Sequence, residues 1–284
     1  MIVHELQSGP ISVIDYRCAL KPGDRPLAAV HRAVTVAYVR RGSFAYHARG
    51  QVSELVTGSV LIGQAGDEYV CTHEDSFGDE CLAFEFSASA VSAIGGRRWF
   101  GRANGLPPIG DVSVFGELAV AAADGHSDIG LDEAGLLLAA RVARTVWRES
   151  PRALQATPRD RRRAIEAAYW IDAHSGETID LEQIAREAGL SMFHFLRLFT
   201  RVLSLTPHQY LIRARLRHAA QLLAAGATSI TEVAADVGFG DLSNFVRTFR
   251  RAAGVSPGEF QRAARGGRKI FQDRPVAVTV YSHA

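Results

Sequence analysis

Arginines recur at matched places in two segments of the C-terminal half of this sequence. Arg197 lies eight residues after Gly189, and Arg247 lies nine residues after Gly238. A guanidinium group offers a planar fork of N–H donors that fits the two acceptors on guanine in the major groove, and it also binds phosphate. The chemistry that these residue types favour is therefore recognition of nucleic acid.

The two segments are copies of one pattern. In each, a short amphipathic stretch is followed by a glycine, which can end a helix in the left-handed conformation, and then by a second stretch with two inward-facing phenylalanines. The offset between the copies is 49 residues before the turn and 50 after it, so the second turn is longer by one residue. Duplicated units of helix, glycine turn and basic helix are typical of helix-turn-helix proteins, whose second helix enters the DNA major groove. The matching positions are Ala185 and Ala234, Gly189 and Gly238, Phe195 and Phe245, Arg197 and Arg247, Phe199 and Phe249, Arg201 and Arg251, and Pro207 and Pro257.

A long helix is expected between the two copies. It begins at Thr206, runs to about Ala225 and is followed by Gly226. At ~1.5 Å per residue it would be roughly 28 Å long, which approaches the ~34 Å between equivalent major-groove positions one DNA turn apart. We therefore expect a rod that holds two reading helices about one turn of DNA apart.

Residues from about 160 to 265 resemble the DNA-binding domain of the AraC/XylS family of bacterial transcription regulators. Ser204 departs from the pattern, because the first repeat of the family usually has glycine there, and some strain is expected at that helix end. The resemblance implies a DNA-binding transcription regulator whose partners are double-stranded DNA and RNA polymerase. The residues that carry it are Ala185, Gly189–Ser191, Arg197–Phe199, Thr206–Tyr210, Arg215, Leu216, Ala219, Ala220, Leu222, Leu223, Ile230, Val233, Ala234, Val237–Phe239, Phe245, Arg247, Phe249, Ser256 and Pro257.

The family pattern also indicates which side chains would face DNA. Phe193 and Leu196 could instead pack in the core, and the arginines, Arg247 included, could form salt bridges with acidic residues. The base-facing candidates are Phe193, Leu196 and Arg197 on the first reading helix and Leu242, Ser243 and Arg247 on the second. The candidates for phosphate contact are Ser191, His194, Arg201, Asn244, Arg250 and Arg251.

The composition fits a soluble globular protein of about two domains. Hydrophobic residues make up 47% of the chain and charged residues 22%, and no apolar run is long enough for a membrane helix. The first residues lack the features of a signal peptide, so a cytoplasmic location without a membrane partner is expected. Charge is uneven, because residues 159–270 contain 17 Lys and Arg against 11 Asp and Glu, whereas the remainder has 15 against 19. A basic C-terminal domain beside an acidic partner domain suits phosphate binding.

The N-terminal part has the pattern of an antiparallel β-structure. Short β-branched and aromatic runs such as Ala33–Val39 and Gly42–His47 alternate with Gly, Pro and Asp. Residues 55–67 resemble the second motif of cupins, although Tyr69 stands where a metal-binding histidine is expected, and His31 is the one remnant of the first motif. The expected fold is therefore α+β and multidomain: an N-terminal cupin-like β-barrel without the usual metal site, following helices, and a C-terminal all-α double helix-turn-helix domain.

These observations divide the chain into a ligand-sensing cupin-like domain (residues 1–110), a helical segment (111–150), a linker (151–158), the DNA-binding domain (159–267) and a tail of unknown role (268–284). The helical segment could form a subunit interface, and so a homodimer, or could only cover the barrel. In the leading hypothesis the barrel binds a small-molecule effector of unknown identity, and no cofactor, metal ion or catalytic residue is assigned. The alternative is a cupin-type metalloenzyme fused to the DNA-binding domain, which would need histidine ligands such as His31, His47 and His73.

The three cysteines, Cys18, Cys71 and Cys81, are an odd number and predict no disulfide framework. Residues 71 and 73 of a strand point to the same side, and Cys81 could lie opposite His73 if the intervening loop closes a hairpin. Cys71, His73 and Cys81 could therefore hold a metal ion or sense oxidants, which would make the N-terminal domain a metal or redox sensor. The alternative is that the cysteines are small buried hydrophobes and that His73 is simply hydrogen-bonded.

Overall fold

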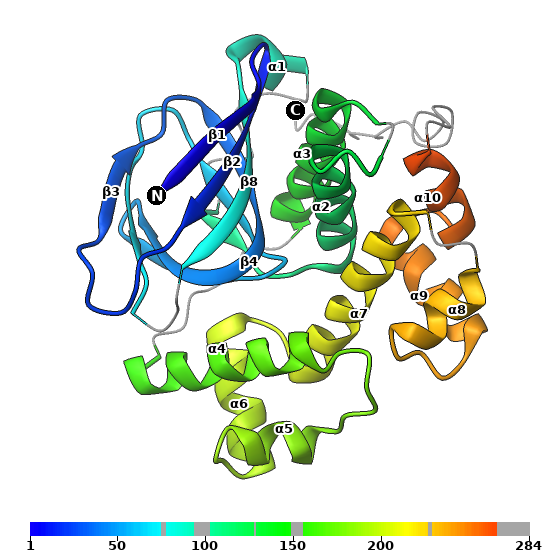
Figure 1. The fold of residues 1–284 in the computed structure, drawn as a ribbon. Coiled ribbons are helices and arrows are strands. Elements are labelled where there is room, and N and C mark those ends of the chain that lie inside the picture. The colour runs from blue at the N-terminus through cyan, green and yellow to red at the C-terminus, as the bar shows by residue number, and fades with distance from the viewer. Residues whose placement is uncertain (75–77, 94–102, 128, 149–155, 227–228, 266–284) are drawn as a thin grey trace, which may run out of the picture.

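The computed structural model describes residues 1–74, 78–93, 103–127, 129–148, 156–226 and 229–265 of the chain. Strands make up its N-terminal part and helices its C-terminal part (Figure 1). The expected order of an antiparallel β-structure, following helices and an all-helical domain is confirmed. Most of the expected linker and the whole of the expected tail lie outside the described residues. No described helix combines the length and the apolar character that crossing a membrane requires.

The described strands form a connected antiparallel sheet. Its main path runs β1-β2-β8-β4-β6-β9, while β5 and β7 pair with β4, and β3 pairs with β7. Along β2 buried residues alternate with half-buried ones, as the two-residue period of a strand requires. The strands are β1 (Ile2–Gln7), β2 (Ile11–Cys18), β3 (Leu27–Val30), β4 (Val34–Ala48), β5 (Gln51–Val56), β6 (Val60–Gly63), β7 (Glu68–Thr72), β8 (Asp79–Phe86) and β9 (Gly105–Leu106), and the short helix α1 (Ala88–Ala93) follows β8.

Strand β4 differs from the prediction. The segments Ala33–Val39 and Gly42–His47, expected as two short strands, form a single strand of 15 residues. A bulge between Val39 and Arg41 bends it, so that its first half pairs with β6 and β8 and its second half with β5 and β7. Gly42 lies at this bend with φ of 88°, and a Cβ there would be 2.3 Å from a backbone oxygen of the neighbouring strand. The glycine therefore marks a close approach of two strands and not the end of one.

Helices α2 (Gly110–Ala123) and α3 (Leu131–Arg148) cover the sheet on the side that faces the C-terminal helices (Figure 1). Phe115 of α2 and Leu138 of α3 are completely or almost completely buried, in one core with Phe84 of β8. The apolar faces of both helices are thus buried within the chain, so both helices cover the sheet. A subunit interface on these helices stays a proposal.

The C-terminal domain consists of seven described helices. The expected rod between the two copies is a single helix of 18 residues, α7. The helices are α4 (Pro158–Ala173), α5 (Leu181–Glu187), α6 (Met192–Leu203), α7 (Pro207–Ala224), α8 (Ile230–Asp236), α9 (Leu242–Ala253) and α10 (Pro257–Ala264).

The apolar core is continuous from the sheet to the second half of the helical domain. One cluster of buried side chains includes Phe84 of β8, Leu118 of α2, Leu216 of α7 and Phe249 of α9. The first half, α4 to α6, has a core of its own that includes Val56 of β5. Helix α2 packs against both α7 and α9. The helical domain is therefore joined to the strand domain by shared core as well as by the chain.

Polar contacts also cross the boundary between the strand domain and the helical domain. Glu117 of α2 is 2% exposed and accepts hydrogen bonds from the Tyr38 hydroxyl of β4 (2.6 Å) and from Nε2 of Gln221 on α7 (2.8 Å). Burial raises the pKa of Glu117, and these two hydrogen bonds act against that shift. Elsewhere Arg161 of α4 forms an ion pair with Glu54 of β5 at 3.0 Å. Both halves of the helical domain are thus held to the strand domain by directed contacts.

Candidate nucleic-acid interface

Two helix-turn-helix units, α5 with α6 and α8 with α9, are joined by α7 (Figure 1). Capping side chains determine where most of these helices begin. Asp180, Ser229 and Asp241 accept hydrogen bonds from first-turn backbone N–H groups of α5, α8 and α9. Thr206 and Ser256 form complete capping boxes at the starts of α7 and α10. The helix start expected at Thr206 is therefore confirmed.

Left-handed residues end several of the helices. Gly189 (φ 63°) and Gly238 (φ 82°) follow α5 and α8, and Gly254 (φ 79°) ends α9. Ser204 takes the place of Gly254 at the end of α6 with φ of 59°, a conformation that costs a residue with a side chain about 1–2 kcal/mol. The strain expected at Ser204 is thus present in the backbone. Helix α6 begins three residues after its turn glycine and α9 four residues after, so the extra residue of the second copy lies in its turn.

Each reading helix buries one face and exposes the other. Phe195 and Phe199 of α6, and Phe245 and Phe249 of α9, are completely buried. Leu196 is half-buried, and Leu242 is 40% exposed. The side chain of the base-facing candidate Phe193 lies outside the described residues. The exposed candidates are Ser191, His194, Arg197 and Arg201 on the first unit and Leu242, Ser243, Asn244, Arg247, Arg250 and Arg251 on the second.

The exposed start of α9 is organised by side-chain hydrogen bonds. The Asp241 carboxylate accepts from the backbone N–H of Ser243 (3.1 Å) and of Asn244 (2.8 Å). The Asn244 side-chain oxygen accepts from Nη2 of Arg247 at 3.2 Å. Within the described part of the chain Arg247 makes no ion pair, so its guanidinium is held by an amide and keeps donors for another partner. Ser191, at the start of α6, makes no capping hydrogen bond with its side chain.

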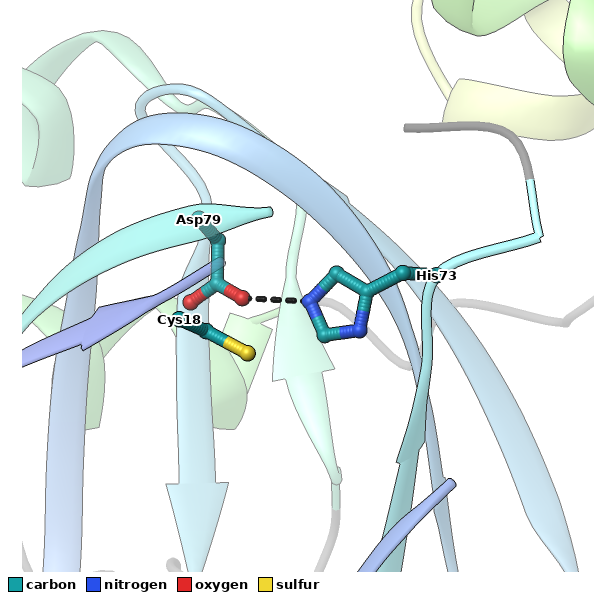
Figure 2. Close-up of side chains that lie close together, drawn as sticks. All are labelled: Cys18, His73 and Asp79. Carbon is teal, nitrogen blue, oxygen red and sulfur yellow. Dashed lines mark hydrogen bonds and ion pairs between the residues drawn. The ribbon is translucent and has the colours of Figure 1, made fainter. Parts of the chain in front are cut away.

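Cys71, His73 and Cys81 are the candidates for metal or redox chemistry, and their neighbours in the structure differ from those expected from the sequence. Nε2 of His73 lies 2.6 Å from Oδ1 of Asp79, and the Cys81 thiol donates to Oδ2 of Asp79 at 3.2 Å. Cys18 lies near both His73 and Asp79 (Figure 2), whereas Cys71 is buried in an apolar cluster. Burial raises the pKa of both Cys71 and Cys81. Sequence reasoning missed Cys18 and Asp79, because only the pairing of β2 with β8 places them opposite each other.

The three histidines required by the metalloenzyme alternative have separate partners. His31 stacks on Tyr69 with 4.3 Å between ring centroids, and its Nε2 is 2.8 Å from the Tyr46 hydroxyl. His47 is hydrogen-bonded to Thr72, and His73 pairs with Asp79. Tyr69 stands where cupins have a metal-binding histidine, and it packs on His31, the one remnant of the first cupin motif.

Lowering the pH from 7 to 4 is expected to destabilise the strand domain through His31. Burial lowers the pKa of His31 from 6.5 to about 4, so between these values the unfolded chain binds a proton that the folded chain does not. The stability due to neutral His31 is complete above pH 6.5 and is lost as the pH falls toward 4. The free energy of unfolding, measured against pH, should therefore fall less steeply for His31→Gln than for the wild type. His4→Gln, at an exposed position of β1, serves as the control, and equal slopes for all three proteins would contradict the prediction.

Comparison with known proteins places the C-terminal helices in a family. Residues 184–263 match the family model "Helix-turn-helix domain". "Probable transcriptional regulator LumQ" of Photobacterium leiognathi is 36% identical over 92 residues, which are 32% of this chain and 37% of that protein. "HTH-type transcriptional activator RhaS" of Klebsiella pneumoniae (strain 342) is 34% identical over 115 residues, which are 40% of this chain and 41% of that protein. The match therefore spans well under half of the length of either relative.

Solved structures are similar over the same part of the chain. The DNA-binding domain of AdpA, in complex with a target DNA, is 33% identical with a TM-score of 0.36, and the match covers 37% of this chain and 95% of that one. An AraC-type regulator from Chromobacterium violaceum is 28% identical with a TM-score of 0.35, covering 36% of this chain and 91% of that one. The named relatives are transcription regulators and not enzymes, as expected, and the metalloenzyme alternative has no counterpart among them. The C-terminal domain of this chain is a helix-turn-helix DNA-binding domain of the AraC/XylS family.

Proposed function

We propose that the chain as a whole is a sequence-specific transcription regulator that binds double-stranded DNA through α6 and α9. The observation that carries the proposal is the pair of helix-turn-helix units whose reading helices expose their polar faces. With 18 residues, α7 is about 27 Å long, which suits two major-groove contacts about one DNA turn, ~34 Å, apart. The similar domain of AdpA was solved in complex with a target DNA, which supports the same role for this domain.

The proposal assigns base contacts to the first turns of the reading helices. The guanidinium groups of Arg197 and Arg247 match guanine, and Leu196 and Leu242 suit the methyl group of thymine. Phosphate contacts position the domain without reading the base sequence. We assign them to side chains beside or beyond the first turns of the reading helices. The base-facing set is Phe193, Leu196, Arg197, Leu242, Ser243 and Arg247, and the phosphate set is Ser191, His194, Arg201, Asn244, Arg250 and Arg251.

The proposal gives the strand domain the role of a sensor. The strands would form a cupin-like barrel that responds to a small-molecule effector in the cytoplasm, in a homodimer that acts on RNA polymerase; these features follow from the family resemblance. A cleft of about 50 Å³ between the strands and α4 is lined by Phe44, Glu54, Glu74, Arg161 and Ile165, among others. A small molecule in this cleft would contact both domains, and so could alter how α4 is held.

Arg197 and Arg250 are expected to contribute differently to DNA binding. Arg197→Ala should relax the preference for a single base pair by about 1–3 kcal/mol, because it removes a bidentate contact to guanine. Arg250→Ala should weaken binding to all sequences alike and lower the salt dependence by about one counterion. Arg247→Ala should act like Arg197→Ala, but in the other half of the site, about 10 base pairs away.

The measurement starts from an operator selected by the full-length protein out of random DNA. Binding of each variant to a library of mutated operators is then measured at two salt concentrations. Arg17→Ala, which removes an exposed arginine of β2, is the control and should change neither preference nor salt dependence. If Arg197→Ala and Arg250→Ala give the same uniform loss on every operator, the assignment of the reading helices is wrong.

A further inference from the structure

A cluster of metal-ligating side chains lies within the strand domain. Sγ of Cys18, a ring nitrogen of His73 and a carboxylate oxygen of Asp79 all lie within 4.8 Å of one another. Three segments contribute, since Cys18 ends β2, His73 follows β7 and Asp79 begins β8. Cys18 and Asp79 are cross-strand neighbours, and Figure 2 shows that the thiol and the carboxylate approach the imidazole ring from the same side.

The histidine of this cluster is buried with only one of its two nitrogens satisfied. The side chains of His73 and Asp79 are 2% and 9% exposed. Asp79 accepts a hydrogen bond from Nε2 of His73, and Nδ1 of His73 has no hydrogen-bond partner among the described residues. Because a carboxylate only accepts, Nε2 carries the proton of the neutral ring and Nδ1 keeps a buried lone pair. Leaving such a group unpaired is unfavourable, and a cation bound there removes that cost.

The donor types select one class of ion. Thiolate, imidazole and carboxylate are the ligands that Zn²⁺ takes in proteins, whereas Ca²⁺ and Mg²⁺ prefer oxygen alone. A carboxylate that holds one N–H of the ring is also the usual support of a metal-binding histidine. We propose that Cys18, His73 and Asp79 form a binding site for a divalent transition-metal ion of the zinc class.

Two arrangements of the ion suit these atoms. In the first, His73 binds through Nδ1 while Asp79 holds and orients Nε2–H. In the second, the ion replaces the proton between Nε2 and Asp79. Ligand atoms about 2.0–2.1 Å from a tetrahedral ion stand about 3.3 Å apart, so the second arrangement needs the 2.6 Å contact to open by less than about 1 Å. Figure 2 shows the Cys18 thiol on the Nε2 side of the ring, which favours the second arrangement, and the Cys81 thiol lies 3.2 Å from Asp79.

The site borders the surface on which the DNA-binding domain rests. The His73 ring lies 6.1 Å, between centroids, from Phe44. Phe44 lines the cleft between the strands and α4, together with Arg161 and Ile165 of that helix. An ion bound by His73 would therefore fix a side chain that contacts the lining of this cleft. The metal site itself does not depend on DNA binding.

The test uses full-length protein, stripped of metal with a chelator and titrated with Co²⁺. Wild-type protein should bind a single equivalent per chain with a thiolate-to-metal charge-transfer band in the near ultraviolet, and Zn²⁺ should displace the cobalt. Cys18→Ser should lose this band. His73→Gln and Asp79→Asn should each weaken cobalt binding by about 10-fold to 100-fold.

Cys71→Ser is the matched control, because Cys71 is another cysteine of the strand domain but is buried in an apolar cluster. It should keep the band and the affinity of the wild type. Thermal melts of the metal-free proteins show which variants fold, and only folded variants are compared. Wild-type protein that takes up no cobalt, a complex without the thiolate band, or a band that persists unchanged in Cys18→Ser would overturn the proposal.

Discussion

Replacing Arg217 with methionine is expected to lower the free energy of unfolding by about 3 kcal/mol, because it leaves a partly buried carboxylate without its counter-charge. Arg217 of α7 is 4% exposed and forms an ion pair with Asp172 of α4. The Tyr210 hydroxyl donates a second hydrogen bond to Asp172 at 2.8 Å. Burial raises the pKa of Asp172, and Arg217 is the main influence that acts against that shift. The effect is measured by urea unfolding of the full chain at pH 7.

A double-mutant cycle separates the ion pair from the volume of the side chain. Arg217→Met combined with Asp172→Asn should be less destabilising than the sum of the two single changes, because no unpaired charge remains. Arg144→Met is the control: Arg144 pairs with Asp111 but its side chain is 43% exposed, so it should cost about 1 kcal/mol or less. A loss for Arg217→Met as small as that of the control would contradict the prediction.

Arg217 also lies where the two domains meet. A Cβ placed on Gly58, in the turn between β5 and β6, would be 2.7 Å from Nη1 of Arg217. The turn therefore lies directly against the guanidinium group, and a side chain at position 58, where φ is 86°, would crowd it. Loss of Arg217 thus removes a support of the strand domain as well as one of the links between α4 and α7.

Gly238→Val is expected to unfold the second helix-turn-helix unit rather than to remove a DNA contact. Gly238 has φ of 82°, where a residue with a side chain is strained by about 1–2 kcal/mol or more. A Cβ there would also lie 2.9 Å from the backbone oxygen of Gly176 and 3.1 Å from Cζ of Arg215. A backbone atom cannot move aside cheaply, so the cost should exceed the strain alone. The expected result is a lower melting temperature together with loss of operator binding.

The first helix-turn-helix unit provides the matched control for this substitution. Gly189 occupies the equivalent turn with φ of 63°, but a Cβ there meets no heavy atom within 4 Å. Gly189→Val should therefore show backbone strain with much less crowding, and a smaller fall in melting temperature than Gly238→Val. Equal falls would mean that the contacts around Gly238 contribute nothing, and a wild-type melt with normal DNA binding would show that the turn has been misread.

Most of the helical domain could be predicted from the sequence, because its determinants are local. Capping residues such as Thr206 and Ser256 act within three or four positions of the helix start. Gly189 and Gly238 end helices through their own backbone conformation. The phenylalanine pairs follow the helical period, so the buried and exposed faces of α6 and α9 could be assigned without coordinates. Because the pattern occurs twice, the assignment of each copy supports the assignment of the other.

The strand domain and the domain boundary were decided by contacts that no short pattern contains. Strand β4 continues through Gly42 because its two halves have different partner strands. Cys18 and Asp79 meet only through the register of β2 with β8. The buried carboxylate of Glu117 accepts a hydrogen bond from Gln221, 104 positions away in another domain. The sequence by itself determined the helices that we propose read DNA, and their faces, through interactions between residues a few positions apart. Strand pairing and domain docking depend on residues far apart in the chain, and only the tertiary structure decided them.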